Sequence, residues 1–443
     1  MELQDTFKTI LSNLGITEWN SIQKESFVAI QQEKEILLLA PTGSGKTLAF
    51  LLPILAKLNT EVQQIQCLIL TPSRELALQI EQVWKKMATG FKVNAFYGGH
   101  NMSVEIQNLT QPPALLIGTP GRIADHITRK TLDLTQVYTI VLDEFDKSLA
   151  LGFHDQMAFI TQHLKKLKTK VLVSATDISV LPDFIGIRKP YILHFTKAVE
   201  AVPALKIYTL VSEAKDKIET LFQLLCALGA TSTIVFCNHR EAAERTSQLL
   251  WERGIENAFF HGGMEQIDRE KTLIQFRNGS THFLIASDLA ARGLDIADIQ
   301  NIIHYHLPHK NEDYIHRNGR TARMDATGKA YIIWHPAEKL PAYWTELPEK
   351  IVLPTQTRLP QRSEWTTIYI SGGKKDKLSK GDIVGYLVKI GGLELSEIGL
   401  IHVMDFMSFA AVQKKRLKTV LPILQQGKMK GRKYKIQEAP LNG

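Results

Sequence analysis

The chain has 443 residues, of which 44% are hydrophobic and 22% are charged, and its net charge is +8. This length indicates two to four domains rather than one core. No apolar run approaches the roughly 20 residues of a membrane span, and the N-terminus lacks the layout of a secretion signal. The three cysteines are scattered and fit neither a disulfide framework nor a metal site. We therefore expect a cytoplasmic protein without a membrane partner.

In the first half of the chain, short apolar runs alternate with helix-like segments. Continuous apolar runs with this spacing indicate parallel strands buried on both faces, and hence an α/β domain. The strands expected here are Ile36–Ala40, Cys67–Leu70, Ala114–Ile117, Thr139–Leu142 and Val171–Ser174.

A glycine-rich loop with the sequence PTGSGKT, residues 41–47, follows the first of these strands and precedes a helix-like stretch. Glycines let backbone N–H groups turn around a phosphate at a helix N-terminus, whose dipole favours negative charge. Lys46 would reach the β- and γ-phosphates, and the Thr47 hydroxyl would bind Mg²⁺. This loop predicts a nucleotide site.

About a hundred residues later, the strand Thr139–Leu142 ends in a run of acids, DEFD. Asp143 at the strand end can hold Mg²⁺ through water, and Glu144 can position or deprotonate the attacking water. Taken alone, adjacent carboxylates on a loop are usually solvated charge. The buried strand before them and the phosphate loop upstream favour a catalytic role.

A second block repeats the alternation of apolar runs and helical segments. Its expected strands are Thr233–Cys237, Asn257–Phe260, Phe283–Ala286, Ile299–Tyr305 and Ala330–Trp334. Five prolines then punctuate about 25 residues without periodicity, which indicates either a linker or an extension packed on the second block.

The last part of the chain is basic and has a different order of elements. From Ser363 onward, 14 Lys and Arg stand against 7 Asp and Glu, so this tail carries +7 of the net +8. Such a concentration of charge favours a polyanion-binding element over a merely solubilising tail. The order of expected elements is βαββαβ, the plan of an RRM, in which aromatic side chains on the sheet stack on bases. Tyr369 on the first strand stands at such a position.

The motifs APTGSGKT, TPSRELA, Gly98-Gly99, TPGR, DEFD, SAT, ASDLAARGLD and HRNGRTAR, in this order, resemble the DEAD-box RNA helicases over about residues 1 to 345. The C-terminal stretch resembles the RNA-binding domain of DbpA-type helicases. The resemblance implies an α/β fold of two tandem RecA-like P-loop domains, plus a small α+β RRM-like domain. We expect these at residues 1–197, 205–345 and 364–443, with a Pro-rich linker at 346–363.

The resemblance also assigns roles in an ATP site. Gln23 matches the glutamine that reads adenine, and Asp295 the acid that holds the ribose. Arg320 and Arg323 resemble arginines that meet the γ-phosphate, with His316 in the same network. Ser174 and Thr176 belong to the segment that couples hydrolysis to strand separation. Thr42, Gly43, Ser44 and Gly45 complete the phosphate loop, and ATP and Mg²⁺ are the implied cofactors.

The resemblance further implies an RNA groove, lined by backbone amides and hydroxyls that hold phosphates without reading sequence. In the first block the matching residues are Pro72, Arg74, Glu75, Gly98, Gly99, Thr119, Pro120, Gly121 and Arg122. In the second block they are Gly263, Gln266, Arg269, Ser287, Asp288 and Arg292.

The function expected is that of an ATP-dependent RNA helicase that opens short duplexes locally, with large-subunit ribosomal RNA as its partner during ribosome assembly. The alternatives are a general RNA-remodelling helicase without a ribosomal hairpin preference and a non-catalytic, ATP-dependent RNA clamp. A processive DNA helicase of the same superfamily is a further alternative, against which Gln23 and the DEFD and SAT motifs argue.

Overall fold

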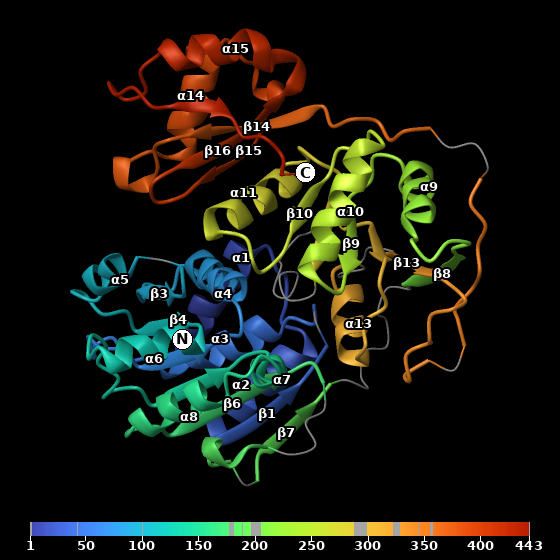
Figure 1. Ribbon diagram of the computed structural model, residues 1–443. Coiled ribbons are helices and arrows are strands. Elements are labelled where there is room, and N and C mark those ends of the chain that lie inside the picture. The colour runs from blue at the N-terminus through green and yellow to red at the C-terminus, as the bar shows by residue number, and fades with distance from the viewer. Residues whose placement is uncertain are drawn as a thin grey trace. The chain divides into compact units, whose positions relative to one another are not determined.

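The computed structural model describes residues 2–41, 43–99, 101–176, 181–187, 189–195, 205–287, 299–321, 328–344, 346–354 and 358–442 (Figure 1). The chain divides near residue 202 into two compact units. Among the helices in these ranges, none combines the length and the apolar character that a bilayer crossing requires.

The first unit is built on a seven-stranded parallel sheet with the order β3-β4-β2-β5-β6-β1-β7. Its strands are β1 (Glu35–Leu39), β2 (Cys67–Leu70), β3 (Val93–Phe96), β4 (Leu115–Gly118), β5 (Thr139–Leu142), β6 (Thr169–Ser174) and β7 (Tyr191–His194). Its helices are α1 (Glu2–Leu14), α2 (Ser21–Gln32), α3 (Lys46–Lys57), α4 (Arg74–Met87), α5 (Met102–Asn108), α6 (Pro120–Thr128), α7 (Phe145–Ala150), α8 (His154–His163) and the 3₁₀ turn η1 (Asp183–Ile185).

Both faces of this sheet are buried, because successive residues of each strand point to opposite sides. On β1, Leu38 belongs to the core on which α1 to α4 pack, which includes Trp84. The next residue, Leu39, belongs to the opposite core, formed with α6 to α8 and including Phe145. This burial on two faces explains the continuous apolar runs in the sequence.

The second unit contains a six-stranded parallel sheet with the order β10-β11-β9-β12-β13-β8. Its strands are β8 (Lys206–Val211), β9 (Thr233–Cys237), β10 (Ala258–Phe260), β11 (Phe283–Ser287), β12 (Asn301–His304) and β13 (Lys329–Trp334). The helices around it are α9 (Ile218–Leu228), α10 (Arg240–Glu252), α11 (Gln266–Arg277) and α13 (Asn311–Asn318).

The first part of the Pro-rich segment is bound to the edge of this sheet. Thr209 on β8 receives a hydrogen bond from Ile351 N–H at 2.9 Å and donates its own N–H to Glu349 O at 2.7 Å. Ile351 and Leu353 pack against the core of the domain. These residues therefore form an extension packed on the second block, which is one of the two arrangements that the sequence left open.

The C-terminal part of the second unit is a four-stranded antiparallel sheet with the order β15-β16-β14-β17. Its elements are β14 (Trp365–Ile370), η2 (Lys374–Asp376), α14 (Lys380–Lys389), η3 (Leu395–Glu397), β15 (Ile398–Val403), β16 (Ser408–Gln413), α15 (Lys414–Gln426) and β17 (Ile436–Glu438). Two parallel-sheet domains and a small α+β domain of RRM type confirm the fold class expected from the sequence.

The antiparallel sheet is covered on both faces within the second unit. Ile368 and Ala410 lie in a core with α14 and α15, whereas Phe409, only 2% exposed, packs on the opposite face with Ile274 of α11. At this seam, the contact between the small domain and the second parallel-sheet domain, the hydroxyls of Ser280 and Thr367 are hydrogen-bonded at 2.8 Å.

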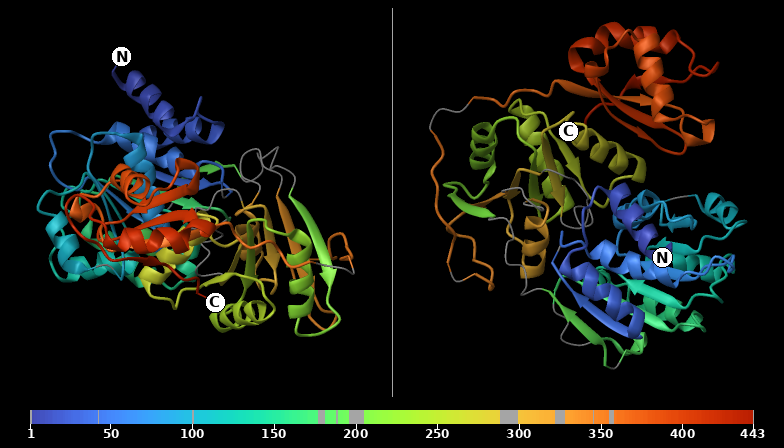
Figure 2. Two further views of the ribbon diagram at one scale, coloured as in Figure 1. Left: turned by 90° about the horizontal axis from the view of Figure 1, so that it is seen from above. Right: turned by 180° about the vertical axis from the view of Figure 1, so that it is seen from behind.

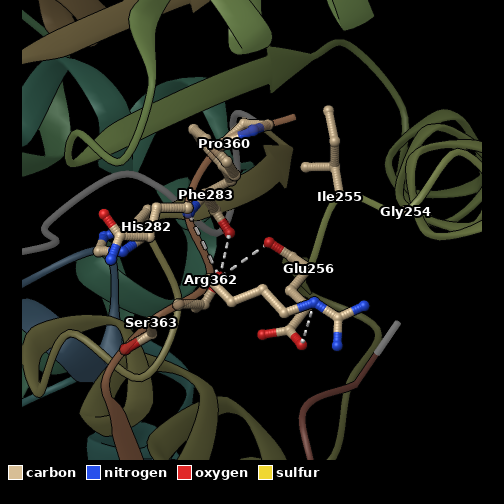
Figure 3. Close-up of a pocket in the computed structure, with 10 residues that line it drawn as sticks. Gly254, Ile255, Glu256, His282, Phe283, Pro360, Arg362 and Ser363 are labelled. Atoms are coloured by element: carbon tan, nitrogen blue, oxygen red, sulfur yellow. Dashed lines mark hydrogen bonds and ion pairs between the residues drawn. The ribbon is translucent and has the colours of Figure 1, made fainter. Parts of the chain in front are cut away.

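The end of the chain closes the same seam beside β10 (Figures 1 and 2). Phe259 donates its N–H to Asn442 O at 3.3 Å, and the amide of Gln275 donates to Ala439 O at 2.7 Å. A small pocket lies at the border of the seam, where the Glu256 carboxylate pairs with Arg362 at 3.4 Å (Figure 3). The same carboxylate pairs with Lys414 at 3.2 Å. These contacts hold the small domain on the second parallel-sheet domain.

Candidate nucleotide site and RNA interface

The phosphate loop connects β1 to α3 in the tight geometry that its glycines permit. Gly43 and Gly45 have φ of 82° and 86°, in the region that side chains avoid. A Cβ at Gly45 would also lie 2.8 Å from the Gln23 amide nitrogen, so the loop and this glutamine are in close contact. Lys46 begins α3 and donates from Nζ to Ala40 O at 2.6 Å. The loop therefore presents backbone amides and a lysine at a helix N-terminus.

Asn20 is a residue of this site that sequence reasoning missed. Its side chain caps α2 by accepting from Gln23 N–H at 2.9 Å, while Gln23 Oε1 accepts from Asn20 N–H at 3.1 Å. The Asn20 amide also donates to Ser44 O at 3.0 Å. Asn20 therefore ties the predicted adenine-reading glutamine to the phosphate loop, and its signal in the sequence is a cap-forming residue three positions before Gln23.

Asp143 and Glu144 lie at the carboxyl end of β5, with Asp143 N–H bonded to Leu70 O at 2.9 Å. Glu144 has φ of 47°, a strained value for a non-glycine residue, and donates its N–H to Asp143 Oδ1 at 2.9 Å. Lys147, one turn along α7, donates to Glu144 Oε1 at 2.5 Å. The two carboxyl groups are thus buried, oriented and partly neutralised from one side.

Burying the charged groups of this site without a ligand costs folding free energy, because burial disfavours their charged forms. Burial raises the pKa of Asp143 to about 7, and the Glu144 charge adds to the rise. Burial likewise lowers the pKa of Lys46. Carboxylate and hydroxyl oxygens are ligands that Mg²⁺ prefers, and amides at a helix N-terminus suit phosphate. Asp143, Thr47 and the loop therefore fit a magnesium–nucleotide complex.

The raised pKa of Asp143 leads to a testable stability effect. The folded-state pKa of about 7 lies above the ordinary value of 3.8, so the folded state binds this proton more tightly. The wild-type protein should therefore lose stability as pH rises from about 4 to about 7. We expect Asp143→Asn to raise the free energy of unfolding of the nucleotide-free protein by roughly 1–4 kcal/mol near pH 8. Denaturant melts across this pH range would show the gain shrinking toward about pH 4; a constant gain would contradict the shift.

The DEFD and SAT segments are joined directly. Thr176 Oγ1 donates to Asp146 Oδ2 at 2.9 Å, and Ser174 Oγ accepts from Thr176 N–H at 3.1 Å. Ser174 also pairs with Leu39 in the β1–β6 register, so it stands beside the start of the phosphate loop. The last acid of the DEFD run is therefore hydrogen-bonded directly to the SAT segment.

The residues predicted to line an RNA groove in the first domain come together at the carboxyl ends of β2, β3 and β4, which are neighbours in the sheet. The Arg74 guanidinium lies over the glycine pair, since a Cβ at Gly99 would be 2.6 Å from Arg74 Nη1. Thr119 is the residue before the first turn of α6 and donates its N–H to Phe96 O at 3.1 Å. Pro72, Glu75, Gly98, Pro120, Gly121 and Arg122 lie on the same segments. The strands β5, β6 and β1, which lead into the candidate nucleotide site, follow in the sheet order.

In the second domain, the described candidates lie at the ends of β10, β11 and α13. Gly263 donates its N–H to His261 Nδ1 at 3.2 Å, Gln266 begins α11, and Arg269 stacks over the Phe260 ring at 5.1 Å. Ser287 ends β11, while His316 and Arg320, both buried, lie on α13 and just after it. Thr42, Asp288, Arg292, Asp295 and Arg323 lie outside the described residues, and the roles of all these candidates stay predictions.

Two loops of the small domain form a basic surface that we call the basic loop pair, residues 374–377 and 428–435. The loops are joined where Lys430 Nζ donates to Lys377 O at 2.8 Å and pairs with Asp382 at 2.8 Å. Lys377 and Lys430 both have positive φ, near 59° and 50°. The pair contains eight exposed basic residues and one acid, Asp376. Such a surface suits a phosphate backbone.

Tyr369, predicted to stack on a base, is half-buried at the seam with the second domain. Its ring meets that of Phe409 edge-on, with centroids 5.7 Å apart, in the cluster that includes Ile274. The face of the sheet on which an RRM usually displays aromatics is therefore packed against protein in this structure. The stacking role of Tyr369 stays a prediction.

Paired parallel-sheet domains, with a phosphate loop and acidic strand end in the first, define a nucleotide-driven helicase core. Residues 20–183 match the DEAD/DEAH box helicase family, residues 216–325 the helicase conserved C-terminal domain, and residues 367–438 the DbpA RNA binding domain. The chain belongs to the DEAD-box RNA helicases, and its third domain places it in the DbpA type.

Full-length relatives and solved structures agree with this membership. The chain is 32% identical over 439 residues to the ATP-dependent RNA helicase DbpA of Escherichia coli, covering 97% of this chain and 96% of that protein. It is 30% identical to the protein of the same name from Bacillus subtilis, with the same coverage. The structure of S. cerevisiae Dbp5 bound to RNA and ADP BeF3 is 26% identical, with a TM-score of 0.66 over 74% of this chain and 86% of that one.

Proposed function

We propose that this chain hydrolyses ATP to open short RNA duplexes, and that its third domain directs the reaction to large-subunit ribosomal RNA during ribosome assembly in the cytoplasm. The observation that carries the proposal is the order of strands in the first sheet. Strands β3, β4 and β2 lead into the segments proposed to contact RNA, and β5, β6 and β1 lead into the proposed nucleotide site. Ligands at the two sites would therefore share one rigid sheet edge.

Each residue of the nucleotide site has a proposed task. The loop amides and Lys46 bind the phosphates, and Thr47 with Asp143 hold the magnesium ion, which neutralises phosphate charge when bound. Glu144 accepts the proton of the attacking water, with Lys147 setting the direction of its carboxylate. Arg320 and Arg323 of the second domain stabilise the charge that develops on the terminal phosphate.

The coupling between hydrolysis and RNA is proposed to run through the bond between Thr176 and Asp146. Asp146 lies two residues after Glu144, and Thr176 lies two residues after the end of β6, so this bond links the two segments. A rearrangement of the acids during turnover would shift the SAT segment. The same coupling makes RNA an activator of hydrolysis.

RNA selection is proposed to use the basic loop pair. The small domain matches the DbpA RNA binding domain, and its sheet face is occupied by α11. Its exposed positive charge concentrates on residues 374–377 and 428–435. A structured RNA held there would lie on the same unit as the second helicase domain.

ATP hydrolysis by the full chain, measured against a panel of RNAs, tests this proposal. We expect at least about tenfold stimulation by RNA, and half-saturation by large-subunit ribosomal fragments at concentrations about tenfold below those of size-matched random RNA. Equal half-saturation by all RNAs would leave a general RNA-remodelling helicase. A rate that RNA does not change would refute the proposal.

A further inference from the structure

A buried acidic residue, Glu105 on α5, lies beneath the RNA-groove segments of the first domain. Only 1% of its surface is exposed. Its Oε2 accepts from Arg122 Nε at 2.6 Å, and its Oε1 accepts from Tyr97 N–H at 3.3 Å. One carboxylate thus contacts the residue before the glycine pair and the arginine of the TPGR segment.

His126 completes this group from the next turn of α6. Its Nε2 lies 2.9 Å from Glu105 Oε2, and its Nδ1 lies 2.8 Å from Thr131 Oγ1. The imidazole is fully buried and stacks on the Phe96 ring, with centroids 4.8 Å apart. Since Phe96 ends β3 and His126 lies on α6, the group fixes α6 against the strand that leads into the glycine pair.

The energetics of burial indicate a positioning role rather than a contribution to stability. Burying a carboxylate is costly, and its ion pairs commonly do no more than offset that cost. What a buried pair does supply is one defined geometry. A bond at Nε restricts the plane of the Arg122 guanidinium, which would otherwise sample several rotamers on a long side chain.

We propose that Glu105 is a positioning residue for RNA binding, which holds Arg122 and the backbone at Tyr97 in the arrangement that receives the RNA phosphates. The proposal rests on the proposed function, because it takes the glycine pair and Arg122 as RNA contacts. It adds that two groove segments, at the glycine pair and at TPGR, are set as one unit by a single carboxylate that RNA itself need not touch.

Glu105→Gln in the full chain tests the proposal, because glutamine keeps the shape and removes the charge. The RNA concentration for half-maximal ATP hydrolysis, measured with an oligouridylate, should rise about tenfold. The rate at saturating RNA should stay within about twofold, because chemistry is untouched. Glu61→Gln, an exposed carboxylate in a loop of the same domain, is the matched control and should behave as wild type.

A double-mutant cycle separates positioning from a general structural defect. If Glu105 acts through Arg122, the variant with both Glu105→Gln and Arg122→Gln should be no weaker in RNA binding than Arg122→Gln alone. Additive losses, or an unchanged half-saturation in Glu105→Gln, would overturn the proposal. If the glutamine variant does not fold, Glu105→Asp replaces it, because aspartate keeps the charge and withdraws it by one methylene. This variant should also raise the RNA concentration for half-maximal hydrolysis and leave the rate at saturating RNA unchanged. Failure of RNA to stimulate the wild-type chain would instead count against the proposed function.

Discussion

Replacing Glu144 by glutamine should reduce RNA-stimulated ATP turnover by about 10²–10⁴-fold. The amide cannot accept the proton of the attacking water, whereas the loop, Lys46 and Asp143 that bind the nucleotide are unchanged. Glu144 is held in a strained left-handed conformation with its N–H on Asp143, so a change of the carboxylate alone should leave the backbone in place. Phosphate release in single-turnover conditions measures the effect.

Binding measurements make the Glu144 result specific. The Glu144→Gln protein should still bind ATP and RNA together, since only the proton acceptor is lost. Glu61→Gln serves as the control for removal of one carboxylate from the first domain. Phosphate release within about threefold of wild type would remove Glu144 from the mechanism.

Neutralising the basic loop pair should weaken RNA binding by the full chain on the order of 10²-fold at physiological salt. The positions chosen are exposed, and their side chains hold no hydrogen bond that shapes the loops: Lys374, Lys375, Lys433 and Lys435, each to Gln. Each lost phosphate contact should lower the slope of log affinity against log salt by about 0.7–0.9. A fluorescence titration with a ribosomal RNA hairpin at several salt concentrations measures both quantities.

A matched set of four exposed lysines outside the loop pair provides the control: Lys339, Lys389, Lys415 and Lys418, each to Gln. Both sets change the net charge equally, so a difference between them reports the location of the charge. Equal losses in the two variants would show that the RNA is held by overall charge and not by the basic loop pair.

The sequence predicted the buried strands well and missed three others. Strands β2, β5 and β9 have the residue bounds that the apolar runs predicted. The missed strands β3, β7 and β8 all lie at the edges of their sheets. An edge strand is partly exposed, as the pattern of β7 shows, where Leu193 alone of four residues is buried. Such strands lack the continuous apolar run on which the predictions relied.

The nucleotide site was predictable because its residues follow strands that share one sheet edge. The local sequence after each strand, a glycine-rich loop or a run of acids, is enough to identify them. Glu105 was not predictable, since nothing in its neighbourhood distinguishes it from a solvated helix carboxylate until α5, α6 and β3 are brought together. The same holds for the small domain, where the plan of strands indicated a sheet face open to RNA. Only the packing of Phe409 on Ile274 shows that this face is covered.

Nucleotide bound at Lys46, Asp143 and the phosphate loop is proposed to favour the conformation that binds RNA tightly. The affinity of a labelled oligoribonucleotide for the Glu144→Gln protein, measured with and without magnesium–ATP, tests it most directly, because hydrolysis is blocked while both ligands bind. We expect nucleotide to tighten RNA binding at least about tenfold, a coupling of roughly 1.4 kcal/mol. The same dissociation constant in both conditions would contradict it.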